Sequence, residues 1–268
     1  MILFRKRHIQ AGLSDMSPDP PRTHAELTAP LRQALDRALQ SAPERVRRVS
    51  AGGQAVWLKQ AERLSLRWRL QKGDPRCGLE AERAGLRVLG ELGLPVARLV
   101  AEGPGYLATA EAGVALADIL ADPAQGGARR LAGFSAAGAA LAALHRAGVA
   151  HGRPALRDIC WDGAQARFID LERYRSGPAK PRRMARDLLI LLHSVLVIRP
   201  EPGPELASVL AGWQSGAPEG LWPEVVRQAA RLARLRGVAR LVRHWRPESR
   251  ELAAGLALLD WLAGQEAG

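Results

Sequence analysis

The feature that most constrains this chain is a short β pattern that interrupts a long helical region. Residues 157–168 contain β-type side chains, an Asp162-Gly163 pair and a second extended run. Helical patterns precede it, over 131–147, and follow it, over 185–198. An Asp-Gly pair between two extended runs predicts a β-hairpin. We therefore expect a hairpin inserted between helices.

The turn of this hairpin implies a register. If Asp162 and Gly163 form a two-residue loop, Asp158 lies opposite Arg167, and Asp158 and Asp170 both emerge at the open end. Asp170 is then further along by roughly 10 Å of extended strand. Two carboxylates at a strand end suit Mg²⁺, which takes few protein oxygens and completes its shell with water and phosphate. They also fit ordinary turn and strand-end positions, so both interpretations stay open.

The sequence before residue 111 predicts a small mixed sheet with one main helix, and the sequence after it is mostly helical. Residues 11–30 are rich in Pro, Ser and Asp, so we expect a flexible tail over 1–30 that packs little. A first lobe then covers 31–111 and a helical second lobe 112–268. The expected elements of the first lobe are a helix from Ala29 to Leu39, a hairpin over 46–59 that turns at Gly52-Gly53, a helix over 79–92 closed by Gly93, and strands over 94–99 and 106–109. The expected helices of the second lobe are 114–120, 131–147, 185–198 and further helices from Pro223, with breaks at Gly237 and Pro247.

The formal net charge of +12 favours an anionic partner such as a nucleic acid, a phosphorylated ligand or an acidic membrane surface. No aromatic-interleaved RNA platform, zinc finger or helix-turn-helix pattern accompanies the charge, which disfavours a nucleic-acid partner. Many arginines concentrate in the second lobe, where they could dock an anionic acceptor or the acidic inner leaflet, or could simply solubilise the surface. These are Arg182, Arg183, Arg186, Arg227, Arg231, Arg234, Arg236, Arg240, Arg243 and Arg246.

Cysteine content and apolar stretches indicate a cytoplasmic location. The chain has two cysteines, Cys77 and Cys160, without metal-ligand spacing, which is typical of a reducing compartment. The N-terminus lacks the apolar region of a secretory signal. The longest dense apolar stretch, 188–198, is too short to span a bilayer. We expect a cytoplasmic protein, with peripheral contact with the inner membrane left open.

One segment resembles a known family. Residues 144–161 read LHRAGVAHGRPALRDICW and lead from a helix end through a loop into the hairpin. This order resembles the catalytic segment of the protein-kinase-like fold, in its bacterial branch of small-molecule and lipopolysaccharide-core kinases. The resemblance covers about residues 45–200. It implies an α+β, two-lobed fold with a small mixed β-sheet in the first lobe and a mainly helical second lobe.

The resemblance assigns roles to the loop and the hairpin. Asp170, in Phe-Ile-Asp-Leu-Glu, matches the metal-binding Asp of the family, and Asp158 stands where the family has a metal-binding Asn. Arg153 stands where the family has its catalytic Asp, although a guanidinium cannot accept a proton. His151 is expected to be structural and to hydrogen-bond the backbone near Asp170, with a catalytic role in proton transfer as the alternative. Asp187 resembles the helix Asp that anchors this loop, or is an acid favoured at a helix N-terminus.

The resemblance also assigns nucleotide-binding residues in and after the first lobe. Lys59 ends an apolar strand, and it is one of only four lysines among 39 basic residues, so a compact ammonium is indicated there. Its family partner matches Glu82, with Glu80 as the alternative. A snorkelling cation and a solvated helix face are the ordinary interpretations of Lys59 and Glu82. Tyr106 to Glu111 would be the connection whose backbone binds adenine.

The implied activity is transfer of the γ-phosphate of ATP, with Mg²⁺, to a hydroxyl of an anionic acceptor such as a lipopolysaccharide-core sugar. General-base help is typically worth ~10² to 10⁴ in rate, so a chain with Arg153 could remain a slow kinase or could use Asp158 as the base. The first alternative is a pseudokinase that binds nucleotide or a partner without efficient catalysis. The second is a basic nucleic-acid-binding protein.

Overall fold

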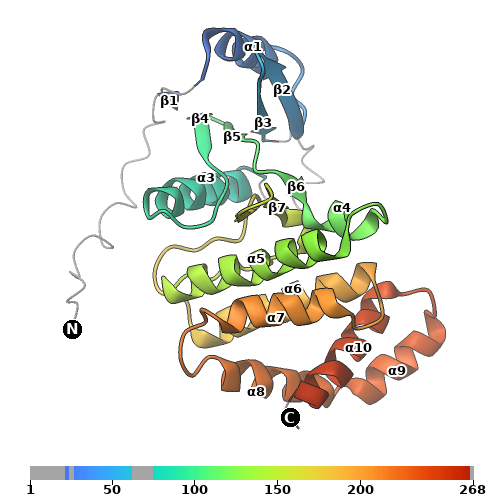
Figure 1. Cartoon of the computed structure of the whole chain (residues 1–268). Helices are drawn as coiled ribbons and strands as arrows, with labels where there is room; N and C mark the ends of the chain where they lie inside the picture. The colour runs from blue at the N-terminus through green and yellow to red at the C-terminus, as the bar shows by residue number, and fades with distance from the viewer. Residues whose placement is uncertain (1–21, 24–26, 62–74, 266–268) are drawn as a thin grey trace. The chain divides into compact units, whose positions relative to one another are not determined.

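The computed structural model describes residues 22–23, 27–61 and 75–265 (Figure 1). The fold is α+β, with an antiparallel sheet in the N-terminal part and a mainly helical C-terminal part. The chain divides into two compact units, one of Met1–Glu80 with Leu99–Ala110 and one of Ala81–Arg98 with Glu111–Gly268. Residues 81–98, which the sequence placed in the first lobe, therefore group with the helical unit.

Within the described residues, the first unit contains a five-stranded antiparallel sheet, one complete helix and residues 75–80, the start of a helix that continues into the second unit. The sheet has the order β1-β4-β5-β3-β2, and α1 contacts β2 and β3. Leu31 and Leu35 of α1 pack with Val56 and Leu58 of β3 in its core. The elements are β1 (Arg22–Thr23), α1 (Ala29–Gln40), β2 (Val46–Ala51), β3 (Gln54–Gln60), β4 (Leu99–Gly103) and β5 (Tyr106–Ala110).

Two expectations for the first unit need correction. The described part of the tail expected over 1–30 is packed, because Arg22–Thr23 pair with β4 and Leu27 is buried in the core. Residues 1–21 of that tail lie outside the described residues. The strand expected over 94–99 begins only at Leu99. Residues 95–97 instead hydrogen-bond Phe168 of the second unit's hairpin, which takes their backbone groups away from the first sheet.

The second unit contains a three-stranded sheet, β6-β7-β8, and several helices. The helix expected over 114–120 starts as strand β6, because Val114 and Ala115 pair with β7. Helix α7 was not expected, although Gly203 and Pro204 mark its start. Gly237, expected as a break, lies in the first turn of α9. The elements are α3 (Pro75–Glu91), β6 (Val114–Ala115), α4 (Leu116–Ala121), α5 (Gly127–Arg146), η1 (Leu156–Asp158), β7 (Ile159–Trp161), β8 (Ala166–Phe168), α6 (Pro181–Ile198), α7 (Pro204–Gln214), α8 (Trp222–Ala233), α9 (Arg236–Trp245) and α10 (Arg250–Gln265).

Helices α5 and α7 lie against each other (Figure 1), and a glycine on each helix allows the two backbones to approach closely. A Cβ on Gly138 of α5 would overlap the backbone of α7, and a Cβ on Gly212 of α7 would overlap the backbone of α5 at Ser135. Neither position tolerates a side chain without separating the two helices. The helix pair is therefore a rigid support for the loop that follows α5.

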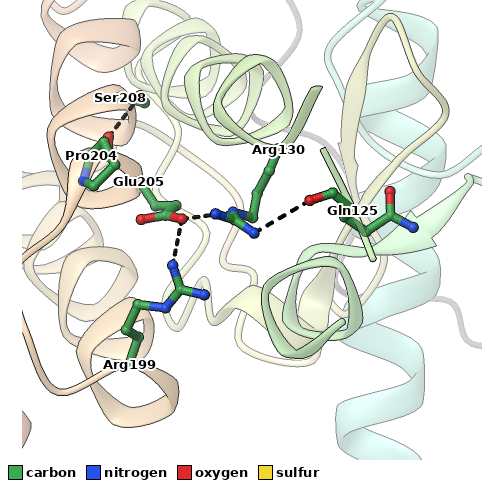
Figure 2. Close-up of polar contacts among 6 residues, drawn as sticks. All are labelled: Gln125, Arg130, Arg199, Pro204, Glu205 and Ser208. Carbon is green, nitrogen blue, oxygen red and sulfur yellow. Dashed lines mark hydrogen bonds and ion pairs between the residues drawn. The ribbon is translucent and has the colours of Figure 1, made fainter. Parts of the chain in front are cut away.

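A buried carboxylate adds a polar contact to this support (Figure 2). Glu205, 1% exposed, accepts hydrogen bonds on Oε1 from Arg130 Nε of α5 and from Arg199 Nη1, both at 2.7 Å. Arg130 also donates to the carbonyl of Gln125 at 3.5 Å. Two guanidinium groups therefore compensate for the burial of one acid and connect α5, α7 and the end of α6.

None of the helices within the described residues is long and apolar enough to cross a membrane. This agrees with the length of the apolar stretch in α6.

Candidate functional site

The loop between α5 and β7 is held by helix α6. The backbone N–H of Gly152 donates to both carboxylate oxygens of Asp187, at 3.0 and 3.2 Å. Further along, the N–H of Leu156 donates to Ser194 Oγ at 3.1 Å. The anchoring role expected for Asp187 is therefore present in the structure. Ser194 was noticed in the sequence only as a polar interruption of an apolar run.

Gly152 is required at its position for two reasons. Its φ of +102° lies in the region that residues with a side chain rarely adopt. A Cβ there would also lie 2.8 Å from Cβ of Arg173. The loop can therefore pass between Asp187 and Arg173 only with glycine at this point.

His151 is buried and neutral. Its Nδ1 accepts a hydrogen bond from the N–H of Arg153 at 3.4 Å, and its ring packs on Phe168 with centroids 4.8 Å apart. Burial lowers the pKa of His151 to about 4, against the opposing effect of Asp187 and Asp170. Its expected bond to the backbone near Asp170 is not found; the ring contacts its own loop instead. Its buried Nε2 has no hydrogen-bond partner among the described residues.

The register of the hairpin differs from the expected one. Trp161 pairs with Ala166, so the turn has four residues, and Cys160, not Asp158, lies opposite Arg167. The carboxylate of Asp162 explains the longer turn, because it accepts from the N–H groups of residues 164 and 165 at 2.9 and 2.8 Å. The open end of the hairpin shifts accordingly.

In the observed register, Asp170 is one residue, and not three, beyond the residue that pairs with Asp158. The N–H of Ile169 donates to the carbonyl of Asp158 at 3.0 Å, so Asp170 is the next residue after the one that pairs with Asp158. Asp158 is buried and Asp170 is half-buried. Burial, and then the charge of Asp170, raise the pKa of Asp158 to about 6, while Arg157 and Arg153 oppose that rise. The two carboxylates are thus electrostatically coupled.

Arg153 lies at the same end of the hairpin. Its Nη2 is 3.7 Å from Oε1 of Glu172, and both side chains are about one-third exposed. Together with His151, Asp170 and Arg173, these two residues line a recess that has no room for a water molecule. Arg153 therefore contributes positive charge beside the acids, and it cannot act as a base.

The predicted nucleotide residues lie in separate parts of the fold. Lys59 is on β3, on the face opposite Val56 and Leu58, which are buried under α1. Glu82 is 3% exposed in α3, which excludes the solvated helix face, whereas Glu80 is only half-buried.

The segment from Tyr106 to Glu111 differs from the expected connection. Tyr106–Ala110 is strand β5, paired with β3 on one side and β4 on the other. Its backbone groups are therefore engaged in the sheet. Only Glu111, which is exposed, follows the strand as connecting chain.

The two hairpin acids are the residues that the sequence predicts to bind a metal ion. Within the described residues, no group of three or more His, Cys, Asp or Glu side chains is positioned to hold a metal ion. Asp158 and Asp170 together provide carboxylate oxygens, the donors that Mg²⁺ prefers, and their mutual repulsion would be relieved by a cation. The pair therefore fits an ion that completes its shell with water and phosphate.

Comparison with known proteins gives limited information. No protein-family model matches the chain, and no curated protein matches it. Among solved structures, the chain is similar to the bifunctional kinase-methyltransferase WbdD, with 17% sequence identity and a TM-score of 0.44. The match covers 68% of this chain and 47% of that one, so the chain corresponds to about half of the length of that protein.

Proposed function

We propose that this chain has a protein-kinase-like fold and transfers the γ-phosphate of ATP to a hydroxyl group. The observation that carries this proposal is the hairpin register, because it brings Asp158 beside the residue that precedes Asp170. The loop that leads into this hairpin is anchored to α6 through Asp187, as the resemblance implies. Phosphoryl transfer depends mainly on positioning and on neutralising charge, which two coupled acids and a cation can supply.

Asp158 and Asp170 are the proposed Mg²⁺ ligands. When bound, Mg²⁺ neutralises charge on the phosphate groups of the nucleotide. The raised pKa of Asp158 supports this role, since a cation favours the ionised form of a carboxyl that burial and Asp170 disfavour.

Lys59, Glu82 and Glu111 are the proposed nucleotide contacts. Lys59 would pair with phosphate oxygens, and its ammonium suits a point contact with a charged oxygen. The burial of Glu82 supports a specific role over a solvated one. Because β5 is engaged in the sheet, the proposed adenine contact is restricted to the chain from Glu111 onward.

The acceptor is proposed to be an anionic hydroxyl compound, and the resemblance favours a lipopolysaccharide-core sugar. Arg153 and Arg173 beside the acids support an anionic acceptor. With Arg153 in place of a base, Asp158 is the carboxylate proposed to take the hydroxyl proton, and Mg²⁺ bound to the same group makes it a weak base. We expect slow turnover.

Replacement of Asp170 tests the proposal. The full chain is mixed with ATP and Mg²⁺, and ADP release and nucleotide binding are measured by coupled assay and calorimetry. We expect Asp170→Asn to lower Mg²⁺-dependent turnover about a hundredfold or more. Asp162→Asn is the matched control, since it makes the same change at the turn end of the same hairpin, and it should retain activity. Equal turnover in both variants would exclude the metal role of Asp170.

A pseudokinase is the second candidate, and a specific observation favours it. The recess beside Asp170 has no room for water, and two of the side chains that line it, Arg153 and Glu172, lie 3.7 Å apart. In this case ATP raises the melting temperature, with the rise lost in Lys59→Met, but no ADP forms. Glu172→Gln separates the two candidates, because opening the recess should increase turnover in a slow kinase and leave a pseudokinase inactive.

A further inference from the structure

A cavity of about 710 Å³ lies among the C-terminal helices of the second unit. Residues of α6, α8, α9 and α10 line it, and the proposed phosphotransfer residues do not. Its volume is in the range of sites for small molecules, which is about 300–1,000 Å³. The cavity is therefore large enough for a ligand of its own.

The interior of the cavity is aliphatic. Its apolar lining comes from leucine and isoleucine side chains, among them Leu189 and Ile190 of α6, Leu232 of α8 and Leu256 of α10. No Phe, Tyr or Trp side chain lines it. A nucleobase or another flat ring would find no aromatic face to stack on, whereas a flexible hydrocarbon chain matches such a wall.

The charged lining is strongly positive. Five arginines and one glutamate, Glu251, contribute to it. Three of the arginines, Arg182, Arg183 and Arg186, lie in the first two turns of α6, and none of the ion pairs between described residues involves them. Of the other polar groups of the lining, Gln228 donates to the carbonyl of Arg182 at 2.7 Å, and Arg236 Nη2 lies 3.0 Å from Asp260 Oδ1.

The position of these arginines is unfavourable for the helix itself. A helix N-terminus carries partial positive charge and is stabilised by acids, but the first turn of α6 has none. Three cations at that end repel both one another and the helix dipole. An anion bound beside these arginines would reduce the repulsion. The charges of the cavity lining therefore indicate a negatively charged ligand.

We propose that this cavity binds an amphiphile with one aliphatic chain and an anionic head group, either a carboxylate or a phosphate monoester. The chain lies among the leucines, and the head group contacts the arginines of α6. Guanidinium groups pair with both kinds of head group in bidentate geometry. This site is independent of the proposed phosphotransfer site.

Calorimetric titration of the full chain tests the proposal. The probes are dodecyl phosphate and dodecanoate below their critical micelle concentrations, with inorganic phosphate and dodecyl maltoside as controls. We expect saturable binding of one molecule of either anionic amphiphile, and binding at least about tenfold weaker for both controls. The stronger of the two amphiphiles identifies the head group. Tight binding of dodecyl maltoside would overturn the anionic preference.

Variants locate the ligand. Arg183→Ala with Arg186→Ala should weaken binding about tenfold or more, since two guanidinium contacts with the anionic head group are lost. Arg243→Ala is the control, because this exposed arginine of α9 does not line the cavity. Equal losses in both variants would contradict the proposed site.

A second pair of variants tests the cavity itself. A Cβ on Gly255 meets only His193, at 4.0 Å, so Gly255→Ala fits and should leave binding unchanged. Gly255→Leu extends into the cavity and should abolish binding while the arginines remain. Binding that survives in Gly255→Leu, or binding only to anionic vesicles and not to monomeric amphiphile, would overturn the proposal.

Discussion

Two parts of the second unit hold their charged side chains in opposite ways. In the region of α5, α6, α7 and the hairpin, Asp187 and Glu205 are each 1% exposed and accept hydrogen bonds from defined donors. Around the start of α6 and on α9, Arg182, Arg186 and Arg243 are exposed. Buried charges are retained only with partners, while exposed charges remain available. The buried acids therefore stabilise the fold and hold the loop before the hairpin, and the exposed arginines can bind a ligand in place of water.

Loss of Glu205 should have the largest effect. Glu205→Ala leaves Arg130 and Arg199 without their shared acid, and breaking such a buried pair costs about 3–5 kcal/mol. Because Arg199 is 39% exposed and can recover solvent, we expect about 3 kcal/mol. Denaturant unfolding followed by circular dichroism measures the change in the free energy of unfolding.

Glu201→Ala is the control for this prediction. Glu201 is an exposed acid just before the same helix, and its loss should change stability by less than about 0.5 kcal/mol. Similar losses for the two glutamates would show that burial does not separate the two kinds of charge, and the comparison would fail.

Replacement of Asp187 should have the next largest effect on stability, and the effect should be local to the loop at Gly152. Asp187→Ala leaves the N–H of Gly152 buried without its acceptor, which costs about 1–3 kcal/mol. Hydrogen exchange of the Gly152 amide should become faster, whereas Asp187→Asn, which keeps one acceptor oxygen, should restore much of its protection. Unchanged exchange in Asp187→Ala would mean that Asp187 does not hold the loop.

The pH dependence of stability probes the hairpin acids. The raised pKa of Asp158, about 6, means that this group stabilises the folded state fully below about pH 4 and loses that contribution as the pH rises through 6. The lowered pKa of His151, about 4, acts in the opposite sense, because the unfolded ring binds a proton below its usual pKa of about 6.5. The two contributions offset each other between pH 4 and 6.

Replacement of Asp158 should reveal the pH dependence of stability that His151 contributes. In Asp158→Asn only the contribution of His151 remains, so the free energy of unfolding should rise more steeply with pH than in the unchanged protein, by about 1–2 kcal/mol between pH 4 and 6. Chemical denaturation at several pH values measures both slopes. Parallel slopes would mean that Asp158 has an ordinary pKa and that the acids are not coupled.

Much of the secondary structure could be predicted because local patterns determine it. The helix over 131–147 and the Gly52-Gly53 hairpin depend on apolar spacing and turn residues, and both are found. The strand expected over 94–99 was misplaced because its partners are distant in sequence, at Phe168. Pairing between remote segments decides such strands, and a single sequence does not contain that information.

The candidate site was predictable in its residues and not in its geometry. The family resemblance indicated Asp158, Asp170 and Asp187, but the register error placed the two hairpin acids too far apart. An Asp-Gly pair indicates a two-residue loop, whereas the side chain of Asp162 stabilises a four-residue turn through its own hydrogen bonds. The buried pairing of Glu205 with Arg130 had no local signal, since 75 residues separate them.

The smallest predicted effect on stability should also be the most selective. Arg183→Glu places an acid in the first turn of α6, where it interacts favourably with the helix dipole and relieves repulsion between neighbouring arginines, so the free energy of unfolding should rise by about 0.3–1 kcal/mol. The same change should abolish binding of dodecyl phosphate in calorimetric titration. A variant that is more stable but no longer binds dodecyl phosphate would show that the arginines of α6 bind the ligand and lower the stability of the helix. A destabilised protein would instead assign Arg183 to the packing of α6, and the contrast between the two regions would not hold at this residue.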